Sequence, residues 1–140
     1  MPTAGDNWSL KEYRPKDSPE AWFFRKNLAP DIPVRHPDYG HSAYLTFAYQ
    51  PRDESGLPTK EDEAILFRIE ESELGSLLSD RLAVQIASVT KSGIKDLLFH
   101  TRDPQEFLRR AEWFRDTYTQ FRVSCEISPD PEWSQYEDFP

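Results

Sequence analysis

The chain has 140 residues, of which 37% are hydrophobic and 14% aromatic, enough apolar side chains for one packed domain. Its 25 acidic and 17 basic residues give a formal net charge of −8, which repels phosphate backbones and anionic membranes and argues against nucleic acid or membrane partners. No apolar run approaches the ~20 residues of a membrane span, and the first residues lack the apolar stretch of a secretion signal, so we expect a cytoplasmic protein.

Prolines mark the gaps between regular elements, because proline cannot donate a hydrogen bond to a helix or a sheet. Six of the twelve prolines precede Tyr39. Residues 1–19 are therefore predicted to form an irregular N-terminal arm. The domain follows at 20–140, and within its first segment, 20–27, the apolar run at 21–24 favours a short edge strand.

From residue 43 onward the pattern becomes regular. Residues 43–50 alternate in the period of two that is typical of a half-buried strand. Thr59 is an N-cap residue followed by three acids, which predicts a helix from about 60 into the seventies. Residues 81–91 and 94–101 then form two strands, joined by a tight turn at Ser92 and Gly93.

A second helix begins after Asp103, with Pro104 in its first turn and Glu106 placed to complete a capping box. Residues 121–127 alternate again and predict a fourth strand. The order strand-helix-strand-strand-helix-strand is that of an α+β, ferredoxin-like sandwich, with a four-stranded antiparallel sheet and both helices on one face.

In that arrangement one face of the sheet packs against the helices and the other is open. The side chains expected against the helices are Leu45, Phe47, Val84, Ile86, Leu97, Phe99, Val123 and Ile127. Those expected on the open face are Tyr44, Thr46, Gln85, Ala87, Asp96, Leu98, His100, Arg122 and Glu126. A slip of one residue in the strand that carries His100 would move this side chain into the core.

The open face carries the strongest candidates for chemistry. A histidine between carboxylates can act as a general base, so the polar group of an enzyme or small-ligand site would be Tyr44, Gln85, Asp96, His100, Arg122 and Glu126. His100 can equally be a cross-strand polar contact. No nucleophile motif and no phosphate-binding loop is present in the sequence, so we assign no catalytic residue.

Metal and cofactor motifs are also missing from the sequence. His36, Asp38 and His41 are spaced like no helical ligand pair, and solvated loop histidines are the simpler interpretation. The single cysteine, Cys125, excludes an internal disulfide and a cysteine-based zinc site. The acids at 61–63 and 70–73 predict a solvated helix face or, alternatively, a docking surface for a basic partner.

The last residues, PDPEWSQYEDFP, place Trp133, Tyr136 and Phe139 three residues apart. Aromatic rings bury large areas, so we predict that the tail at 129–140 folds back as a strap, over the sheet edge or over the open face beside Trp22 and Phe24. The alternative is an aromatic contact for a partner.

With this layout the chain resembles the bacterial domains of domain-of-unknown-function family 695, over roughly residues 20–137. The resemblance rests on the element order and on the pattern D-P-x-W-x-x-Y at Asp130, Pro131, Trp133 and Tyr136. It implies no site residues, because that family has no assigned function. A more distant resemblance, to the ribonuclease E inhibitor B proteins, rests on the ferredoxin-like plan, the acidic balance and the W-x-x-Y tail, and implies binding to another protein.

We therefore expect a non-enzymatic interaction or regulatory domain of inhibitor or immunity type, which binds a protein partner through acidic surface and needs no cofactor. The alternative is an enzyme or small-ligand domain that uses the open face around His100. A homodimer formed through that face is compatible with either function.

Overall fold

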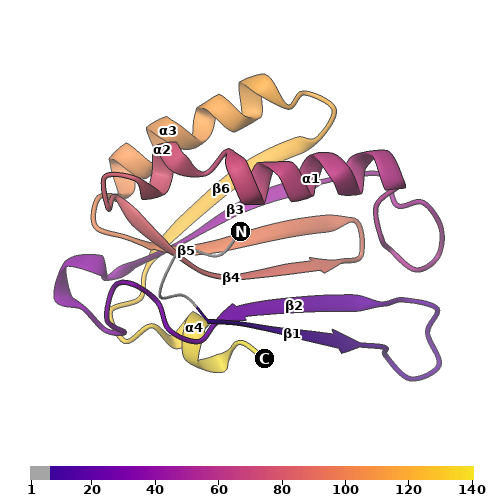
Figure 1. The fold of residues 1–140 in the computed structure, drawn as a ribbon, viewed down its shortest axis with the longest axis horizontal. Helices are drawn as coiled ribbons and strands as arrows, with labels where there is room; N and C mark the ends of the chain where they lie inside the picture. Colours follow the sequence, from indigo (N-terminus) through magenta and orange to yellow (C-terminus); the bar gives the residue numbers. More distant parts are fainter. Residues whose placement is uncertain (1–6) are drawn as a thin grey trace.

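A six-stranded sheet forms the centre of the computed structural model, which describes residues 7–140 (Figure 1). The strand order is β1-β2-β4-β5-β3-β6, and every neighbouring pair is antiparallel. The strands are β1 (Trp8–Tyr13), β2 (Trp22–Asn27), β3 (His41–Ala48), β4 (Ala83–Lys91), β5 (Ile94–Thr101) and β6 (Arg122–Pro129).

Helices lie on both sides of this sheet. The helices α1 (Lys60–Ser72), α2 (Gly75–Leu78) and α3 (Pro104–Thr117) form one layer, and the short α4 (Ser134–Asp138) lies on the other side (Figure 1). A 3₁₀ turn, η1 (Pro37–Tyr39), precedes β3. Within residues 7–140 no helix has both the length and the apolarity needed to cross a membrane.

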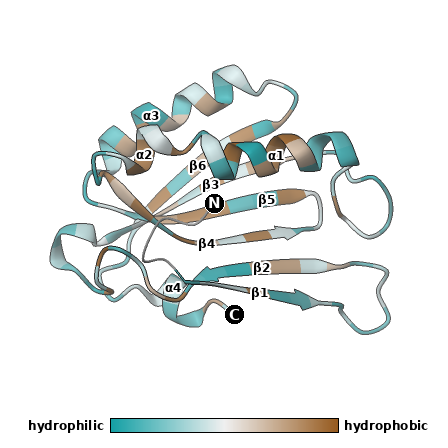
Figure 2. Cartoon of the chain, viewed as in Figure 1, coloured by the Kyte–Doolittle hydropathy of each residue, from teal (hydrophilic) through white to brown (hydrophobic). Residues whose placement is uncertain are grey.

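The prediction of four strands is wrong, because a β1–β2 hairpin extends the sheet beyond β4. β1 lies in the segment predicted to be an irregular arm, whose residues 1–6 fall outside the described part. β2 is a strand as expected, but it is not at the edge, since β1 pairs with its outer side. The exposed, polar β1 is held by this pairing rather than by an apolar pattern of its own, and Figure 2 shows it as largely hydrophilic.

The local signals from residue 59 onward are confirmed where they concern helix starts and the tight turn. The Thr59 hydroxyl accepts from the Asp62 N–H, and the Asp103 carboxylate accepts from the Glu106 N–H. Glu106 does not complete a capping box, however. Its carboxylate binds two arginines of α3, and the Asp103 N–H donates to the Thr101 hydroxyl instead.

The main core lies between the sheet and the layer of α1, α2 and α3. The predicted inward residues Leu45, Phe47, Leu97, Phe99 and Val123 are buried in it, and Ile127 packs at its border. The helices contribute apolar side chains at helical spacing: Leu66 and Ile69 from α1, and Phe107, Ala111 and Phe114 from α3.

The predicted inward positions in β4 are wrong. Val84 and Ile86 face away from the helices, whereas Gln85, expected on the open face, contacts α1. The register shifts by one residue between Gln85 and Ala87, which is a β-bulge. An alternating pattern shows which face of a strand is more apolar, but it does not show what that face packs against. In β4 the more apolar face packs against a second core rather than against the helices.

This second core closes much of the face predicted to be open. It gathers side chains from the loop before β3, from β4 and β5, and from the last twelve residues. Its buried members are Ile32, Tyr39, Val84, Ile86, Ala87, Leu98, Trp133 and Tyr136. The domain therefore has an apolar layer on each side of the sheet.

Candidate functional site

His100, the centre of the site expected from the sequence, is closed to any ligand. Its side chain is 0% exposed, and its ring stacks on Trp133 with 4.1 Å between centroids. Its Nδ1 lies 2.7 Å from the Tyr39 carbonyl oxygen and donates to it, because a carbonyl only accepts. Burial lowers the pKa of His100, and the Tyr39 carbonyl and Asp130 offset this only in part, so the ring is neutral at pH 7.

Of the other five residues of the expected site, Tyr44, Asp96 and Glu126 lie near one another, since Tyr44 pairs with Glu126 across β3 and β6, lines an open surface cavity with it, and both are close enough to Asp96 to interact electrostatically. Tyr44 donates to the Gln135 side chain in the tail, and Asp96 accepts from Thr46, with burial raising the pKa of this carboxyl. Gln85 lies on the opposite face of the sheet. The last two expected residues, Arg122 and Glu126, are exposed and four residues apart on β6.

The tail contacts its own sheet through all three of its aromatic residues. Trp133 is 0% exposed and donates from Nε1 to the Tyr39 carbonyl, and the Tyr136 hydroxyl donates to the Asn27 carbonyl at 2.7 Å. Phe139 packs edge-on against Phe24. These rings therefore cover the sheet between the β1–β2 hairpin and β5.

His36 and Cys125 are the remaining candidates from the sequence. His36 accepts the Asp38 N–H at Nδ1, as a cap of η1. Burial raises the pKa of the Cys125 thiol to about 11, so no thiolate forms at neutral pH. In the described part of the chain, no three His, Cys, Asp or Glu side chains are grouped to hold a metal ion.

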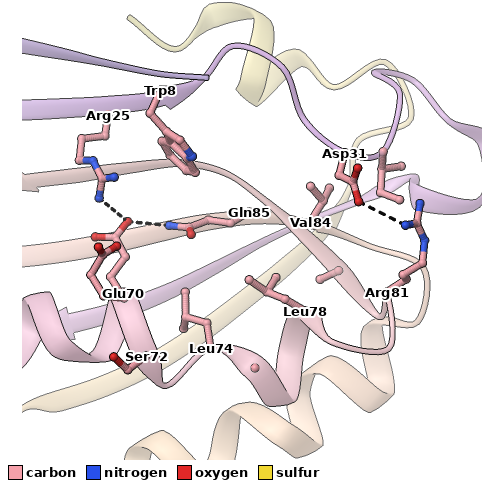
Figure 3. Close-up of a pocket in the computed structure, with 14 residues that line it drawn as sticks. Trp8, Arg25, Asp31, Glu70, Ser72, Leu74, Leu78, Arg81, Val84 and Gln85 are labelled. Carbon is pink, nitrogen blue, oxygen red and sulfur yellow. Dashed lines mark hydrogen bonds and ion pairs between the residues drawn. The ribbon is translucent and has the colours of Figure 1, made fainter. Parts of the chain in front are cut away.

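A polar cluster that the sequence interpretation missed lies on the helix side of the sheet. Its centre is Glu70 of α1, whose side chain is only 5% exposed. Glu70 accepts a hydrogen bond from Gln85 Nε2 at 2.7 Å, and it pairs with Arg25 Nη1 and Lys95 Nζ at 3.1 Å each. Figure 3 shows Arg25 and Gln85 reaching Glu70 from the strands. One carboxylate thus links α1 to β2, β4 and β5.

The charge on Glu70 is stabilised by these partners. Burial on its own would raise the pKa of Glu70, but Lys95 and Arg25, followed by Gln85, outweigh burial and lower the pKa below its usual range. Arg25 also lies over the indole of Trp8, 4.9 Å from its centroid. Glu70 is therefore ionised at neutral pH, in contact with two cations that keep partial access to solvent.

Two cavities flank this cluster, and both are lined by Arg25 and Glu70. The first, of about 300 Å³, runs along α2 and β4 as far as the ion pair between Asp31 and Arg81 (Figure 3). The second, of about 380 Å³, lies toward the loop at 52–58. We call the two cavities together the α1 groove; its walls include the α1 residues Glu63, Leu66, Phe67 and Glu70 and the hairpin residues Trp8, Phe23 and Arg25.

Exposed apolar side chains lie beside the α1 groove. Phe67, which lines the second cavity, is 63% exposed. Leu10, which pairs with Arg25 across the hairpin and shares its face, is 67% exposed. Such side chains next to a cavity are typical of a surface that binds a partner.

The prediction of a solvated acidic face on α1 is right for Glu61 and Glu63 and wrong for Glu70. Glu70 directly follows the buried Ile69 and lies four residues after the buried Leu66, so it sits at the border of the apolar stripe. This spacing is the signal in the sequence that indicates a partly buried Glu70. Its cationic partners come from strands 45 and 25 residues away, which no local pattern reveals.

Fold and site together define a small α+β domain in which a buried ion-pair cluster lies beside an open groove. The family described as "Family of unknown function (DUF695)" matches residues 6–139, and the chain belongs to this family. No curated protein and no solved structure matches the chain.

Proposed function

We propose that this DUF695 chain is a non-catalytic, cytoplasmic interaction or regulatory domain that binds an extended segment of a protein partner in the α1 groove. The observation that carries the proposal is the pair of cavities on either side of the Glu70 cluster, with Phe67 and Leu10 exposed beside them. Regulation by binding, as in an inhibitor or immunity protein, needs such a surface and no catalytic group.

The groove owes its existence to the added hairpin. We regard β4-β5-β3-β6 with α1 and α3 as a ferredoxin-like core, supported by the order of these strands and their antiparallel pairing. The β1–β2 hairpin extends the sheet beyond the helical layer, so its helix-side face is left uncovered next to α1 (Figure 1). In this view the hairpin is the part of the fold that provides the binding surface.

The separation of the two cavities along the α1 groove suits a short stretch of peptide. The second cavity contacts α1 around Leu66 and Phe67, and the first contacts the end of α1 at Ser72. The six residue steps from Leu66 to Ser72 span about 9 Å at 1.5 Å per residue. An extended peptide covers that length in about three residues, so about four residues place a side chain in each cavity.

The charge of the domain bears on the choice of partner. Glu63 lines the second cavity, Glu61 is exposed in the same first turns of α1, and the whole chain carries −8. Acidic surface around a groove accelerates encounter with a basic protein. The resemblance to the ribonuclease E inhibitor B proteins, a bacterial origin and a homodimer through the partly covered sheet face stay predictions.

A peptide library displayed on phage in two formats, with the peptide C-terminus either free or fused to the coat protein, tests the proposal directly. Selection against the immobilised protein is expected to yield a consensus of about four residues, with dissociation constants on the order of 10 µM. Phe67→Ser should weaken the selected peptides about tenfold or more, because it removes an exposed ring from the groove wall.

The matched control is Leu108→Ser, which changes an apolar side chain that is 43% exposed on α3, outside the groove. This variant should bind the selected peptides as the parent does. Equal binding by Phe67→Ser, or the absence of a consensus in both library formats, would refute the α1 groove as the binding surface.

An enzyme or small-ligand site around His100 is the second candidate drawn from the sequence. Within residues 7–140 His100 itself is not accessible, because Trp133 and Tyr39 cover its ring, and Asp130, 3.6 Å from its Nε2, caps α4 through the Ser134 and Gln135 N–H groups.

A further inference from the structure

The second cavity of the α1 groove has a local excess of positive charge in an acidic protein. Three cationic side chains line it, Arg25, Arg52 and Lys95, against two carboxylates, Glu63 and Glu70. The local balance is therefore +1, while the whole chain carries −8. Such a site can accept one more carboxylate without leaving a negative charge unpaired.

The cations keep donors available. Lys95 contacts Glu70 Oε1 at 3.1 Å, and Arg25 contacts Glu70 Oε2 through Nη1 at the same distance. An ammonium group has three N–H donors and a guanidinium has five, so one ion pair does not saturate either group. Thr90 pairs with Lys95 across β4 and β5 and lines the same cavity, where its hydroxyl adds a donor.

The rest of the cavity is apolar. Its walls are formed by Phe23, Leu57, Pro58, Leu66 and Phe67. A ligand that fits must therefore place an apolar group against these side chains and a carboxylate against Lys95 and Arg25. The C-terminal residue of a peptide has this combination when its side chain is aromatic or aliphatic.

We propose that the second cavity binds the C-terminal residue of the partner segment, with its α-carboxylate on Lys95 and Arg25 and its apolar side chain against Phe67. This inference rests on the proposed function and specifies the end of the partner that enters the groove. A fatty acid shares this chemistry, but the first cavity, on the other side of Glu70, offers a peptide backbone the polar side chains of Gln85, Asp31 and Arg81 beside its apolar ones.

The test is a titration of the ¹⁵N-labelled protein with two peptides that differ in one group. Acetyl-Ala-Ala-Ala-Phe with a free carboxylate is expected to bind about tenfold more tightly than the same peptide with a C-terminal amide. The difference should shrink as salt is added, because the cations are partly exposed. Shifts are expected at the backbone amides of Phe67 and Lys95.

Two variants locate the effect. Lys95→Met should abolish the difference between acid and amide, but it also leaves Glu70 with one cation fewer and can disturb the fold. Arg52→Gln avoids this problem, because the side chain is one-third exposed and its ion pair, with Asp53, is long at 3.8 Å. Arg52→Gln should reduce the preference for the acid, whereas Lys60→Met, exposed on α1 outside the cavity, should leave it unchanged.

Three results would contradict binding of a C-terminal carboxylate in the second cavity. Equal binding of acid and amide, with Phe67→Ser weakening both, would refute carboxylate recognition while the groove remained a peptide site. Decanoate binding as tightly as the acid peptide would replace the peptide terminus by a lipid. If peptides fused at their C-terminus bind as well as peptides with a free C-terminus, the inference falls and the proposed function stands; a selection without a consensus in either format removes the proposed function itself.

Discussion

The two sides of the sheet differ in how their apolar side chains are covered. On the side of α4 the chain covers apolar strands with its own tail, so Trp133 is 0% exposed and its Nε1 has a partner. On the side of α1 the β1–β2 hairpin has no such cover, and Phe67 remains 63% exposed beside a cavity. Aromatic side chains occur on both sides, but Trp133 is sealed inside the protein, whereas Phe67 is available to another molecule.

The titratable groups also differ between the two sides of the sheet. His100, on the closed side, is neutral because burial lowers its pKa, and its ring is sealed by Trp133. Glu70, on the open side, is ionised because Lys95 and Arg25 lower its pKa despite burial. The closed side therefore relies on packing and the open side on charge, and substitutions on the two sides should have different consequences.

The largest expected effect is on the closed side. Trp133→Ala should lower the free energy of unfolding by about 3–5 kcal/mol, because it removes a fully buried indole and leaves a cavity above His100. Urea unfolding followed by circular dichroism measures this change. The matched control is Trp113→Ala, which removes an indole that is 47% exposed on α3 and should cost about 1 kcal/mol or less. Equal losses in the two variants would contradict a closed second core.

An intermediate effect is expected from Glu70→Gln. Removing one charge from a buried ion pair destabilises strongly, but Arg25 and Lys95 keep some solvent, so we expect a loss of about 2–3 kcal/mol. The exposed Glu63→Gln is the control and should change stability by less than about 0.5 kcal/mol. A Glu70→Gln variant as stable as the parent would show that the cluster does not hold the hairpin to α1.

Glu70 should also contribute to the pH dependence of the unfolding free energy. Its folded-state pKa is lowered, so its contribution is complete above the unfolded pKa of about 4.3 and is lost as the pH falls through the folded value. The difference in unfolding free energy between the parent and Glu70→Gln should therefore shrink on acidification below about pH 4.3.

The smallest expected effect is the titration of His100. Burial lowers its folded-state pKa below the unfolded value of about 6.5, so as the pH falls below 6.5 the unfolded chain takes up the proton first and stability decreases. His100→Phe keeps an aromatic ring beside Trp133 and removes the titration. The decrease in unfolding free energy between pH 7.5 and pH 5.5 should be smaller in this variant.

The other charges that face His100 are Asp130 and His41, and both are retained in His100→Phe. Identical pH profiles for the parent and His100→Phe would show that His100 does not contribute to the pH dependence.

Much of the fold follows from local signals in the sequence. Thr59 and Asp103 mark the helix starts because an N-cap acts within three residues, and Ser92 and Gly93 mark the hairpin because a tight turn needs positive φ. The extension of the sheet by β1 has no such signal. It depends on pairing with β2, and only the register of the two strands shows which side of each faces α1.

The site is harder to predict than the fold, for a physical reason. Glu70 and its cations are brought together by packing of a helix on three strands, and each residue on its own looks like ordinary solvated charge. His100 looked like a functional residue because it was expected on an open face, but Trp133, 33 residues later in the chain, covers it. An accessible surface is a property of the whole fold.

The contacts of the tail with the hairpin join the two ends of the described chain. Lys11 donates to the Pro140 carbonyl across 129 residues, and Lys26 donates to that of Phe139 across 113. Contacts of such long sequence separation form late in folding, because a large loop must close first. The hairpin that provides the wall of the α1 groove is therefore expected to become fully ordered only once the tail has docked, which makes assembly of the binding surface one of the last steps of folding.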